Sequence, residues 1–290
     1  MISCAQCKEE QIKEEDGICP FKNGDDNLPL RCVGPWANDK LYYLKRYMEV
    51  FNTAMKGKWS KRAYIELFSG PGLGIIRDTG EIIDGSPLIA IKQQTPFSRY
   101  IFVDINSHAT NALESRVRNF RRTNNVRFLT QDCNENIEKI RFNIDNNYLS
   151  LAFVDPTSMQ IKFSTIQQLT RDLKMDMIVN FPLQAINRSY SYALHGYVEK
   201  FDNYFGTDEW KPVIVGNSDI HNIGTRLLDL YKKQFEIIGY TQVNDANSIL
   251  VRGPKNIPLY YIFFVSKNQL AIKLWNSIQE IRSNKQRLLF

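Results

Sequence analysis

The sequence predicts an α/β fold built on a mostly parallel sheet. Three observations support this prediction. Short apolar stretches alternate with amphipathic stretches through the middle of the chain, a glycine-rich turn follows the first apolar stretch, and two apolar stretches lie close together near the end. Regular alternation of strands and helices is typical of right-handed βαβ units, whose successive strands run parallel. Hydrophobic residues make up 43% of the 290 residues, which is sufficient for a packed core.

The elements follow one another in a regular order. Apolar side chains at helical spacing predict an amphipathic helix over residues 38–55. Ser86-Pro87 predicts a helix start, because a side-chain cap precedes a proline whose φ is already helical. Strands are expected at 64–68, 100–103, 126–129, 149–154 and 177–180, and helices at 88–94, 107–120, 137–140 and 164–173.

Two late strands, 248–251 and 259–265, complete the pattern. The short segment between them holds Gly253-Pro254 and cannot form a helical crossover, so the two strands should pair antiparallel. A parallel sheet that ends in an antiparallel hairpin is the pattern of Rossmann-like methyltransferases. Residues 183–225 interrupt the alternation, and we expect them to form a cap insertion over the carboxyl edge of the sheet.

The first residues differ from the rest of the chain. They are polar and rich in cysteine, and Gly34-Pro35-Trp36 marks a boundary. We therefore expect a cysteine-rich metal-binding module over residues 1–35 and an α/β domain over residues 36–290. Thiolates spaced in this way favour zinc, with an iron–sulfur cluster and free thiols as the alternatives. The expected ligands are Cys4, Cys7, Cys19 and Cys32.

The turn after the first strand reads Glu66-Leu-Phe-Ser-Gly-Pro-Gly-Leu-Gly74. Glycines at such a turn let the backbone approach a ligand where a Cβ would collide. A dinucleotide site needs a different glycine spacing and a helix directly after the turn. Here the helix starts only at Ser86, and Thr79-Gly80 predicts a hairpin tip in between. This favours a phosphate-free nucleoside, S-adenosylmethionine, over a dinucleotide.

Three acids lie at the carboxyl ends of adjacent predicted strands, where ligands of α/β sheets bind. Glu66 suits the cationic end of S-adenosylmethionine, Asp104 can accept from the ribose hydroxyls, and Asp132 can accept from the adenine amine. Capping of the next helix or turn is the alternative role for each of them. The expected cofactor residues are Glu66, Phe68, Gly70, Gly72, Asp104, Ile105, Asp132 and Cys133, the last as a small buried filler and not a nucleophile.

Phe153-Val-Asp-Pro-Thr-Ser158 ends the fourth strand. Amino-methylating enzymes carry an acceptor, prolines and an aromatic residue at this point, and here the aromatic is missing. We expect Asp155 to orient an amine or to act as a base, while cofactor binding and a role at the strand end stay open. Asn187 and Arg188, in the cap insertion, are the candidates for contact with substrate.

The formal net charge is +6, and several arginines cluster. A nucleic-acid surface and the solvated face of a helix are the two interpretations. The clustered residues are Arg116, Arg118, Arg121, Arg122 and Arg127. No apolar stretch is long enough to span a bilayer, and the beginning of the sequence does not resemble a secretion signal, so we expect a cytoplasmic protein without a membrane partner.

With these motifs, the sequence resembles the three-Cys-motif partner proteins of bacteria and phages. Pro35-Trp36-x-x-Asp39-Lys40, the glycine turn, Asp84-Gly-Ser-Pro-Leu-Ile-Ala90 and Asn187-Arg188 are among the anchors of the resemblance, which runs from about residue 36 to residue 281. The resemblance implies a class I methyltransferase fold, S-adenosylmethionine as cofactor and a three-Cys-motif protein as partner. The sequence departs from the family at Glu66, where Asp is usual, and at Thr157-Ser158, where Tyr-Gly is usual.

Three functions are compatible with these features. The first is an S-adenosylmethionine-dependent methyltransferase acting on nucleic acid or a modified base, with catalysis by orientation of an in-line transfer. The second is a non-catalytic, methyltransferase-like protein that binds another protein or nucleic acid. An NAD enzyme is the third, and the glycine spacing disfavours it.

Overall fold

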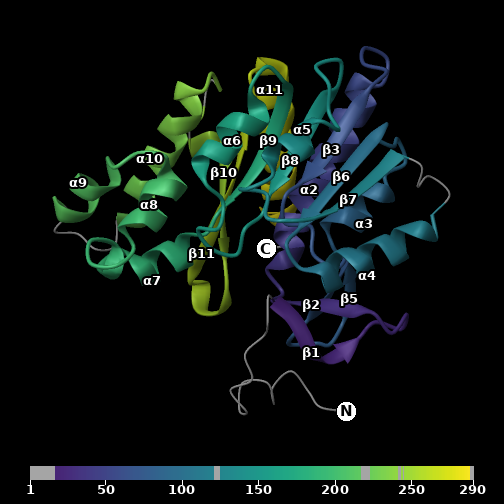
Figure 1. Ribbon diagram of the computed structural model, residues 1–290, viewed down its shortest axis with the longest axis horizontal. Helices are drawn as coiled ribbons and strands as arrows, with labels where there is room; N and C mark the ends of the chain where they lie inside the picture. The colour runs from purple at the N-terminus through teal and green to yellow at the C-terminus, as the bar shows by residue number, and fades with distance from the viewer. Residues whose placement is uncertain (1–16, 121–124, 217–222, 241–242, 244, 288–290) are drawn as a thin grey trace. The chain divides into compact units, whose positions relative to one another are not determined.

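The structure is a computed structural model that describes residues 17–120, 125–216, 223–240, 243 and 245–287. The chain divides into two compact units, Met1–Asp132 and Cys133–Phe290. Both units combine strands and helices in alternation along the chain, so the mixed α/β, Rossmann-like organisation expected from the sequence is confirmed (Figure 1).

The first unit contains three parallel strands, ordered β3-β6-β7 by their pairing. Every residue of β3 is buried, which is typical of a strand covered on both faces. The strands are β3 (Arg62–Glu66), β6 (Arg99–Asp104) and β7 (Val126–Thr130), and the helices are α2 (Ala37–Met55), α3 (Ser86–Ile91) and α4 (Ser107–Arg118). These strands and helices confirm the expected ones to within a few residues.

A second, four-stranded sheet in the same unit was not expected from the sequence. Its order is β1-β2-β4-β5, in which β2 and β4 run parallel and the outer pairs are antiparallel. Its strands are β1 (Ile18–Asn23), β2 (Pro29–Val33), β4 (Leu73–Ile76) and β5 (Ile82–Asp84). The segment before residue 35 therefore shares a sheet with residues well beyond it. The expected hairpin tip at Thr79-Gly80 is confirmed, because the N–H of Gly80 donates to the carbonyl of Ile76 over 2.7 Å.

The second unit contains the remaining strands. β8 and β9 run parallel, and β11 pairs antiparallel with both β9 and β10, so the C-terminal antiparallel hairpin is confirmed. The strands are β8 (Leu149–Val154), β9 (Lys174–Phe181), β10 (Ser248–Arg252) and β11 (Pro258–Val265). The helices are α5 (Ile137–Arg141), α6 (Phe163–Thr170), α7 (Leu183–Ala193), α8 (Val198–Phe205), α9 (Trp210–Val215), α10 (Ile223–Ile237) and α11 (Gln269–Arg287), with 3-10 turns at Asp245–Asn247 and Pro254–Asn256.

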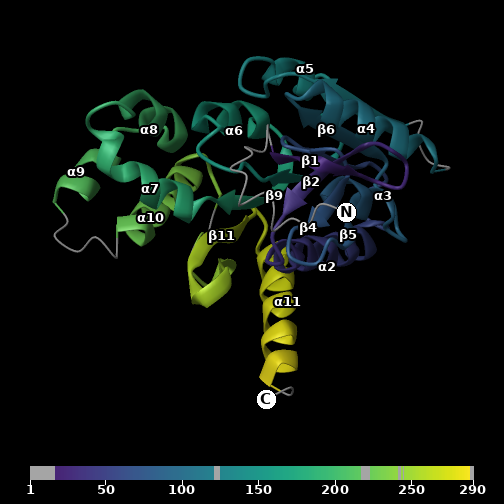
Figure 2. The same cartoon turned by 90° about the horizontal axis from the view of Figure 1, so that it is seen from below.

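The insertion after β9 is helical and forms one group, α7 to α10, in both views (Figures 1 and 2). Aromatic rings join it to the strands. Tyr231 of α10 lies 5.7 Å from Phe181 and stacks on Tyr204 of α8 at 4.7 Å between ring centroids. On the opposite face of β11, Phe264 stacks on Trp275 of α11 at 5.2 Å. The insertion thus packs on one face of the strands through α8 and α10.

Among the residues that the structure describes, every helix is too short or too polar to cross a membrane.

Candidate functional site

The glycine turn after β3 depends on backbone conformations that favour glycine. Gly70 has φ +63° and Gly72 has φ +89°, both in the left-handed region. The turn is tied to the end of the neighbouring strand β6. The N–H of Ser69 donates to the carbonyl of Val103 over 2.9 Å, and the N–H of Gly70 donates to Oδ2 of Asp104 over 2.7 Å. The carboxylate of Asp104, an expected cofactor residue, therefore holds the glycine turn in place.

The β4–β5 hairpin begins directly after Gly72, at the end of the glycine turn, and ends at Gly85, directly before helix α3. The N–H of Gly85 donates to the carbonyl of Gly72 over 2.8 Å, so the two ends of the excursion meet. A Cβ on Gly85 would lie 2.9 Å from the same carbonyl oxygen, too close for any other residue. Helix α3 is late in the sequence, but in space it begins beside the glycine turn.

Asp104 is half-buried at the end of β6, and both of its oxygens accept backbone hydrogen bonds. Oδ1 accepts from the N–H of Asn106 over 2.9 Å, and Oδ2 accepts from Gly70. A carboxylate has about four acceptor sites, so each oxygen retains one for a ligand hydroxyl. The next residue, Ile105, is 66% exposed, which is unusual for a large apolar side chain beside a strand end.

Glu66 is buried completely and is the last residue of β3, directly before the glycine turn. Its Oε2 accepts from the hydroxyl of Tyr64 over 3.0 Å, and its Oε1 accepts from the hydroxyl of Ser86 at the start of α3. The sequence indicated direct or water-mediated contact with a cationic ligand. In the structure this carboxylate joins β3 to the start of α3, and its two hydroxyl partners were not expected.

Asp132 follows β7 and is half-buried. Its neighbour Gln131 donates its N–H to the carbonyl of Asp104 over 3.0 Å, which extends the pairing of β6 and β7 toward Asp132. The three acids therefore lie at the carboxyl ends of adjacent parallel strands, as expected: Glu66 and Asp104 are the last residues of β3 and β6, and Asp132 follows β7. Phe68 is half-buried within the glycine turn, and Cys133 is buried at 3% exposure.

In the second unit, Asp155 follows β8 and meets a buried amide from β9. Nδ2 of Asn180 donates to Oδ1 of Asp155 over 2.9 Å and to the carbonyl of Pro156 over 3.2 Å. Oδ1 of Asn180 is buried without a hydrogen-bond partner among the described residues. Burial raises the pKa of Tyr260, and the negative charge of nearby Asp155 raises it further. The sequence does not single out Tyr260, because it lies among other strand aromatics.

The turn after Asp155 is organised by one side chain. Oε1 of Gln160 accepts from the N–H of Thr157 over 2.9 Å, from the hydroxyl of Thr157 over 3.0 Å and from the N–H of Ser158 over 3.3 Å. These bonds hold the polar pair that stands where the resembling family has Tyr-Gly.

Asn187 and Arg188 lie on α7 and are both exposed. Asn187 faces Gly224 of α10, where a Cβ would lie 2.7 Å from its Oδ1. The two side chains stay predictions for contact with substrate.

Arg116 of α4 is buried at 5% exposure and is not available to a nucleic-acid phosphate. Its guanidinium pairs with both oxygens of Asp26, over 2.7 and 3.0 Å, and donates to the carbonyl of Pro71 over 2.6 Å. It also donates to the carbonyls of Leu28 and Pro29. Arg116 therefore fastens the β1–β2 hairpin to the glycine turn, which corrects both interpretations of this residue. Arg118 is exposed and pairs with Glu114, Arg127 is exposed, and Arg121 and Arg122 lie outside the described residues.

Two of the four expected metal ligands can be located. Cys19 is buried in an apolar cluster with Leu30 and Ile75, and Cys32 packs against the same cluster. Cys4 and Cys7 lie outside the described residues. Within the described ranges, no group of three or more His, Cys, Asp or Glu side chains is placed to hold a metal ion.

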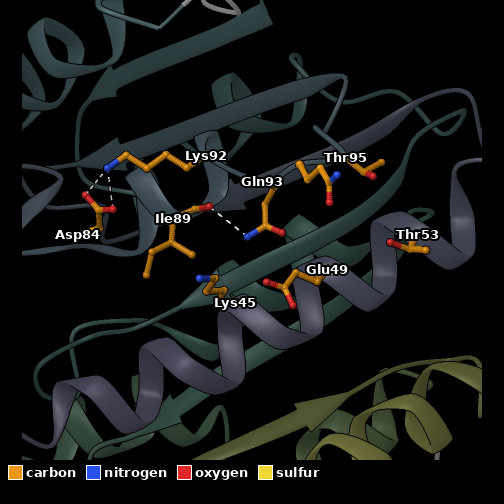
Figure 3. A pocket seen from close by; sticks show the side chains of 9 residues that line it. Lys45, Glu49, Thr53, Asp84, Ile89, Lys92, Gln93 and Thr95 are labelled. Carbon is orange, nitrogen blue, oxygen red and sulfur yellow. Dashed lines mark hydrogen bonds and ion pairs between the residues drawn. The ribbon is translucent and has the colours of Figure 1, made fainter.

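A polar pocket of about 500 Å³ lies between α2 and the β5–α3 segment. Lys45, Glu49 and Thr53 project from α2 on one side (Figure 3). On the other side, Nζ of Lys92 pairs with both oxygens of Asp84 at 2.7 Å. None of the expected cofactor residues lines this pocket, and its charges are balanced within it.

No family model matches the chain, and no curated protein matches it either. Among solved structures, the chain is similar to M. jannaschii TYW2 in complex with AdoMet, at 8% identity and a TM-score of 0.43, over 88% of this chain and 87% of that one. It is similar to the O-methyltransferase from Bacillus cereus in complex with SAH, at 12% identity and a TM-score of 0.47, over 84% and 86%. It is also similar to the N-methyltransferase NodS from Bradyrhizobium japonicum WM9 with S-adenosyl-L-homocysteine, at 9% identity and a TM-score of 0.43, over 92% and 100%. Because these TM-scores lie below 0.5, the roles proposed below are argued from residues of this chain alone.

Proposed function

We propose that this protein binds S-adenosylmethionine in its first unit and is a methyltransferase. One observation carries the proposal. The carboxylate of Asp104 holds the left-handed glycine turn through the N–H of Gly70, and it retains acceptor sites at the carboxyl edge of the parallel strands. This arrangement brings a close backbone approach and a hydroxyl-binding carboxylate to one place, as a nucleoside without phosphate requires.

Each of the expected cofactor residues has a role in the proposed binding of S-adenosylmethionine. Asp104 accepts from the ribose hydroxyls, and exposed Ile105 covers the adenine ring. Asp132 accepts from the adenine amine, while Phe68, Gly70 and Gly72 border the methionine end. Glu66 would act on the methionine end through Ser86 and Tyr64, whose hydroxyls donate to its two oxygens. Cys133 fills buried space next to Asp132.

Methyl transfer would use Asp155 to position the acceptor. S-adenosylmethionine, when bound, would supply an electrophilic methyl group on its sulfonium. An acceptor nitrogen or oxygen would bond to that methyl carbon in line, while the C–S bond breaks and its electron pair leaves with S-adenosylhomocysteine. Asn180 donates to Oδ1 of Asp155 and so orients this carboxylate, which would accept a hydrogen bond from the acceptor group or take its proton. Asn187 and Arg188 would contact the acceptor molecule, and a nucleic acid or modified base is the acceptor that we propose.

The resemblance to three-Cys-motif partner proteins adds a proposed protein partner, a three-Cys-motif protein. A non-catalytic role as a binding partner of another protein or nucleic acid is the second candidate function. The turn after Asp155 supports it, because Gln160 holds Thr157 and Ser158 where an aromatic residue would stack on a base.

Calorimetry with S-adenosylmethionine tests the first step. The wild-type chain should bind it, and Asp104→Ala should weaken binding by about tenfold or more, since a carboxylate that accepts hydroxyls is removed. Asp78→Ala is the matched control, because Asp78 is an exposed acid at the tip of the β4–β5 hairpin in the same unit. Unchanged affinity in Asp104→Ala would refute the assigned site.

Transfer itself is tested with isotope-labelled methyl groups offered to DNA, RNA and the candidate partner protein. Asp155→Asn should abolish labelling and leave S-adenosylmethionine affinity unchanged. Binding without labelling of any acceptor would instead support the non-catalytic function.

We also propose that the cysteines near the N-terminus bind zinc. Cys19 and Cys32 lie in one small apolar cluster, and in this proposal they supply two thiolates, with Cys4 and Cys7 as the other two ligands. Elemental analysis of the purified chain should find about one zinc per chain. The double change Cys4→Ser and Cys7→Ser should remove it, while Cys133→Ser should not. Iron found together with sulfide would favour an iron–sulfur cluster over zinc. A purified chain without metal would refute both the zinc site and the iron–sulfur cluster.

A further inference from the structure

Arg31 of β2 lies over the glycine turn. A Cβ placed on Gly70 would be 3.3 Å from NH1 of Arg31 and 3.6 Å from its Cδ. Strand β2 is fixed in this position by its parallel pairing with β4, where Arg31 is opposite Gly74. The absence of a side chain on Gly70 thus serves a second purpose, because it leaves room for the guanidinium.

The guanidinium of Arg31 differs from that of Arg116, the other arginine at this turn. Arg116 is saturated by Asp26 and by backbone carbonyls that include that of Pro71. Arg31 is half-buried, and no residue in the described part of the chain forms a hydrogen bond or ion pair with its guanidinium. Partial burial of a cation without a partner is unfavourable, so an anionic ligand would be stabilised there.

The charges of S-adenosylmethionine indicate which of its groups Arg31 would bind. Its sulfonium and ammonium groups are positive, and its hydroxyls and adenine amine match the acids at this edge. Its methionine carboxylate needs donors, and the N–H of Gly70 is already used by Asp104. A guanidinium offers two parallel N–H donors in the geometry that a carboxylate accepts.

We propose that Arg31 binds the carboxylate of the methionine end of S-adenosylmethionine. This inference rests on the proposed function and adds the residue that makes the site selective for the amino-acid end of the cofactor. It also gives the small sheet β1-β2-β4-β5 a function, because that sheet carries Arg31 to the turn.

The test compares two ligands that differ only in this carboxylate, S-adenosylmethionine and decarboxylated S-adenosylmethionine. Calorimetry of the full chain should show that the wild type prefers the first ligand. Arg31→Gln should weaken the binding of S-adenosylmethionine by about 10- to 100-fold, the usual effect of a lost charge-assisted pair. The affinity for the decarboxylated ligand should stay nearly unchanged. Arg31→Lys should lie in between, because it keeps the charge and loses the bidentate geometry.

Arg118→Gln is the matched control, since Arg118 is an exposed arginine on α4 of the same unit. Unfolding midpoints of all variants report whether the small sheet is intact. Equal weakening of both ligands by Arg31→Gln, or no weakening of either, would overturn the inference and leave the proposed function standing. If the wild type bound neither ligand, the proposed function would fail, and the role of Arg31 with it.

Discussion

At the scale of single residues, the glycines of the first unit separate two reasons for which a position requires glycine: a left-handed backbone and the lack of space for a Cβ. Gly72 and Gly80 both have left-handed backbones, with φ of +89° and +72°. A Cβ on Gly72 would lie 2.7 Å from Cδ1 of Leu113, whereas a Cβ on Gly80 would meet nothing within 4 Å. Gly57 has neither constraint.

Substitution by alanine should therefore give a graded series. Gly72→Ala should lower the free energy of unfolding by about 2–4 kcal/mol, because strain and collision add. Gly80→Ala should cost about 1 kcal/mol from the backbone alone, and Gly57→Ala should change little. Urea denaturation measures all three. Equal costs at Gly72 and Gly80 would show that the collision is relieved by movement of Leu113.

Asp26 and Arg116 make a pH-dependent contribution to stability. Hydrogen bonding from Arg116 lowers the pKa of Asp26 below its ordinary value near 3.8. A group with a lowered folded-state pKa stabilises the protein above the unfolded pKa, and this contribution is lost as the pH falls through the folded value. The wild type should thus be more stable than Asp26→Asn near neutral pH, and the difference should shrink below about pH 4.

The measurement is the urea midpoint of both proteins across this acidic range. Asp78→Asn, a change at an exposed acid of the β4–β5 hairpin, serves as the control. A constant difference between wild type and Asp26→Asn at every pH would rule out ionisation of Asp26 as its source.

At the scale of elements, the insertion after β9 is held to the strands by rings. Phe181 of β9 is fully buried and lies near Tyr204, Phe205 and Tyr231. Phe181→Ala should lower the free energy of unfolding by about 3–5 kcal/mol, because a large buried ring is replaced by a cavity. Tyr192→Ala, which removes an exposed ring on α7, should change it by less than about 1 kcal/mol. Similar costs for both would contradict the packing that we describe.

The elements also show where the sequence is informative. Strands such as β8 and β9 were predictable because each contains a buried apolar run, residues 151–154 and 177–179, as buried parallel strands do. Strands β1 and β5 were not, because they are partly exposed and flank a sheet that depends on the distant pairing of β2 with β4. The acids at the strand ends could be located in advance. The contact of Glu66 with Ser86 and the position of Arg31 could not. The first depends on where the β4–β5 hairpin returns, and the second depends on the pairing of β2 with β4.

At the scale of the whole molecule, ligand binding and stability are linked. S-adenosylmethionine at about 100 times its Kd should stabilise the folded wild type by about 2.7 kcal/mol, if it binds only the folded form. Chemical denaturation with and without ligand measures this increase. Asp104→Ala at the same ligand concentration should gain about 1.4 kcal/mol or less, because its affinity is expected to be about tenfold weaker or more. Equal stabilisation of both proteins would indicate a binding site that does not involve Asp104.

The hydrogen bond between Gly72 and Gly85 has a consequence for how this protein can vary. The two ends of the β4–β5 hairpin meet at this hydrogen bond. A change in the length of the hairpin therefore need not move the glycine turn or helix α3. Lengthening a closed excursion costs little entropy, on the order of 0.6 kcal/mol for each doubling. The tip near Gly80 is thus a natural attachment point, where a reporter peptide or an added recognition segment could be grafted without disturbing the chemistry at its base.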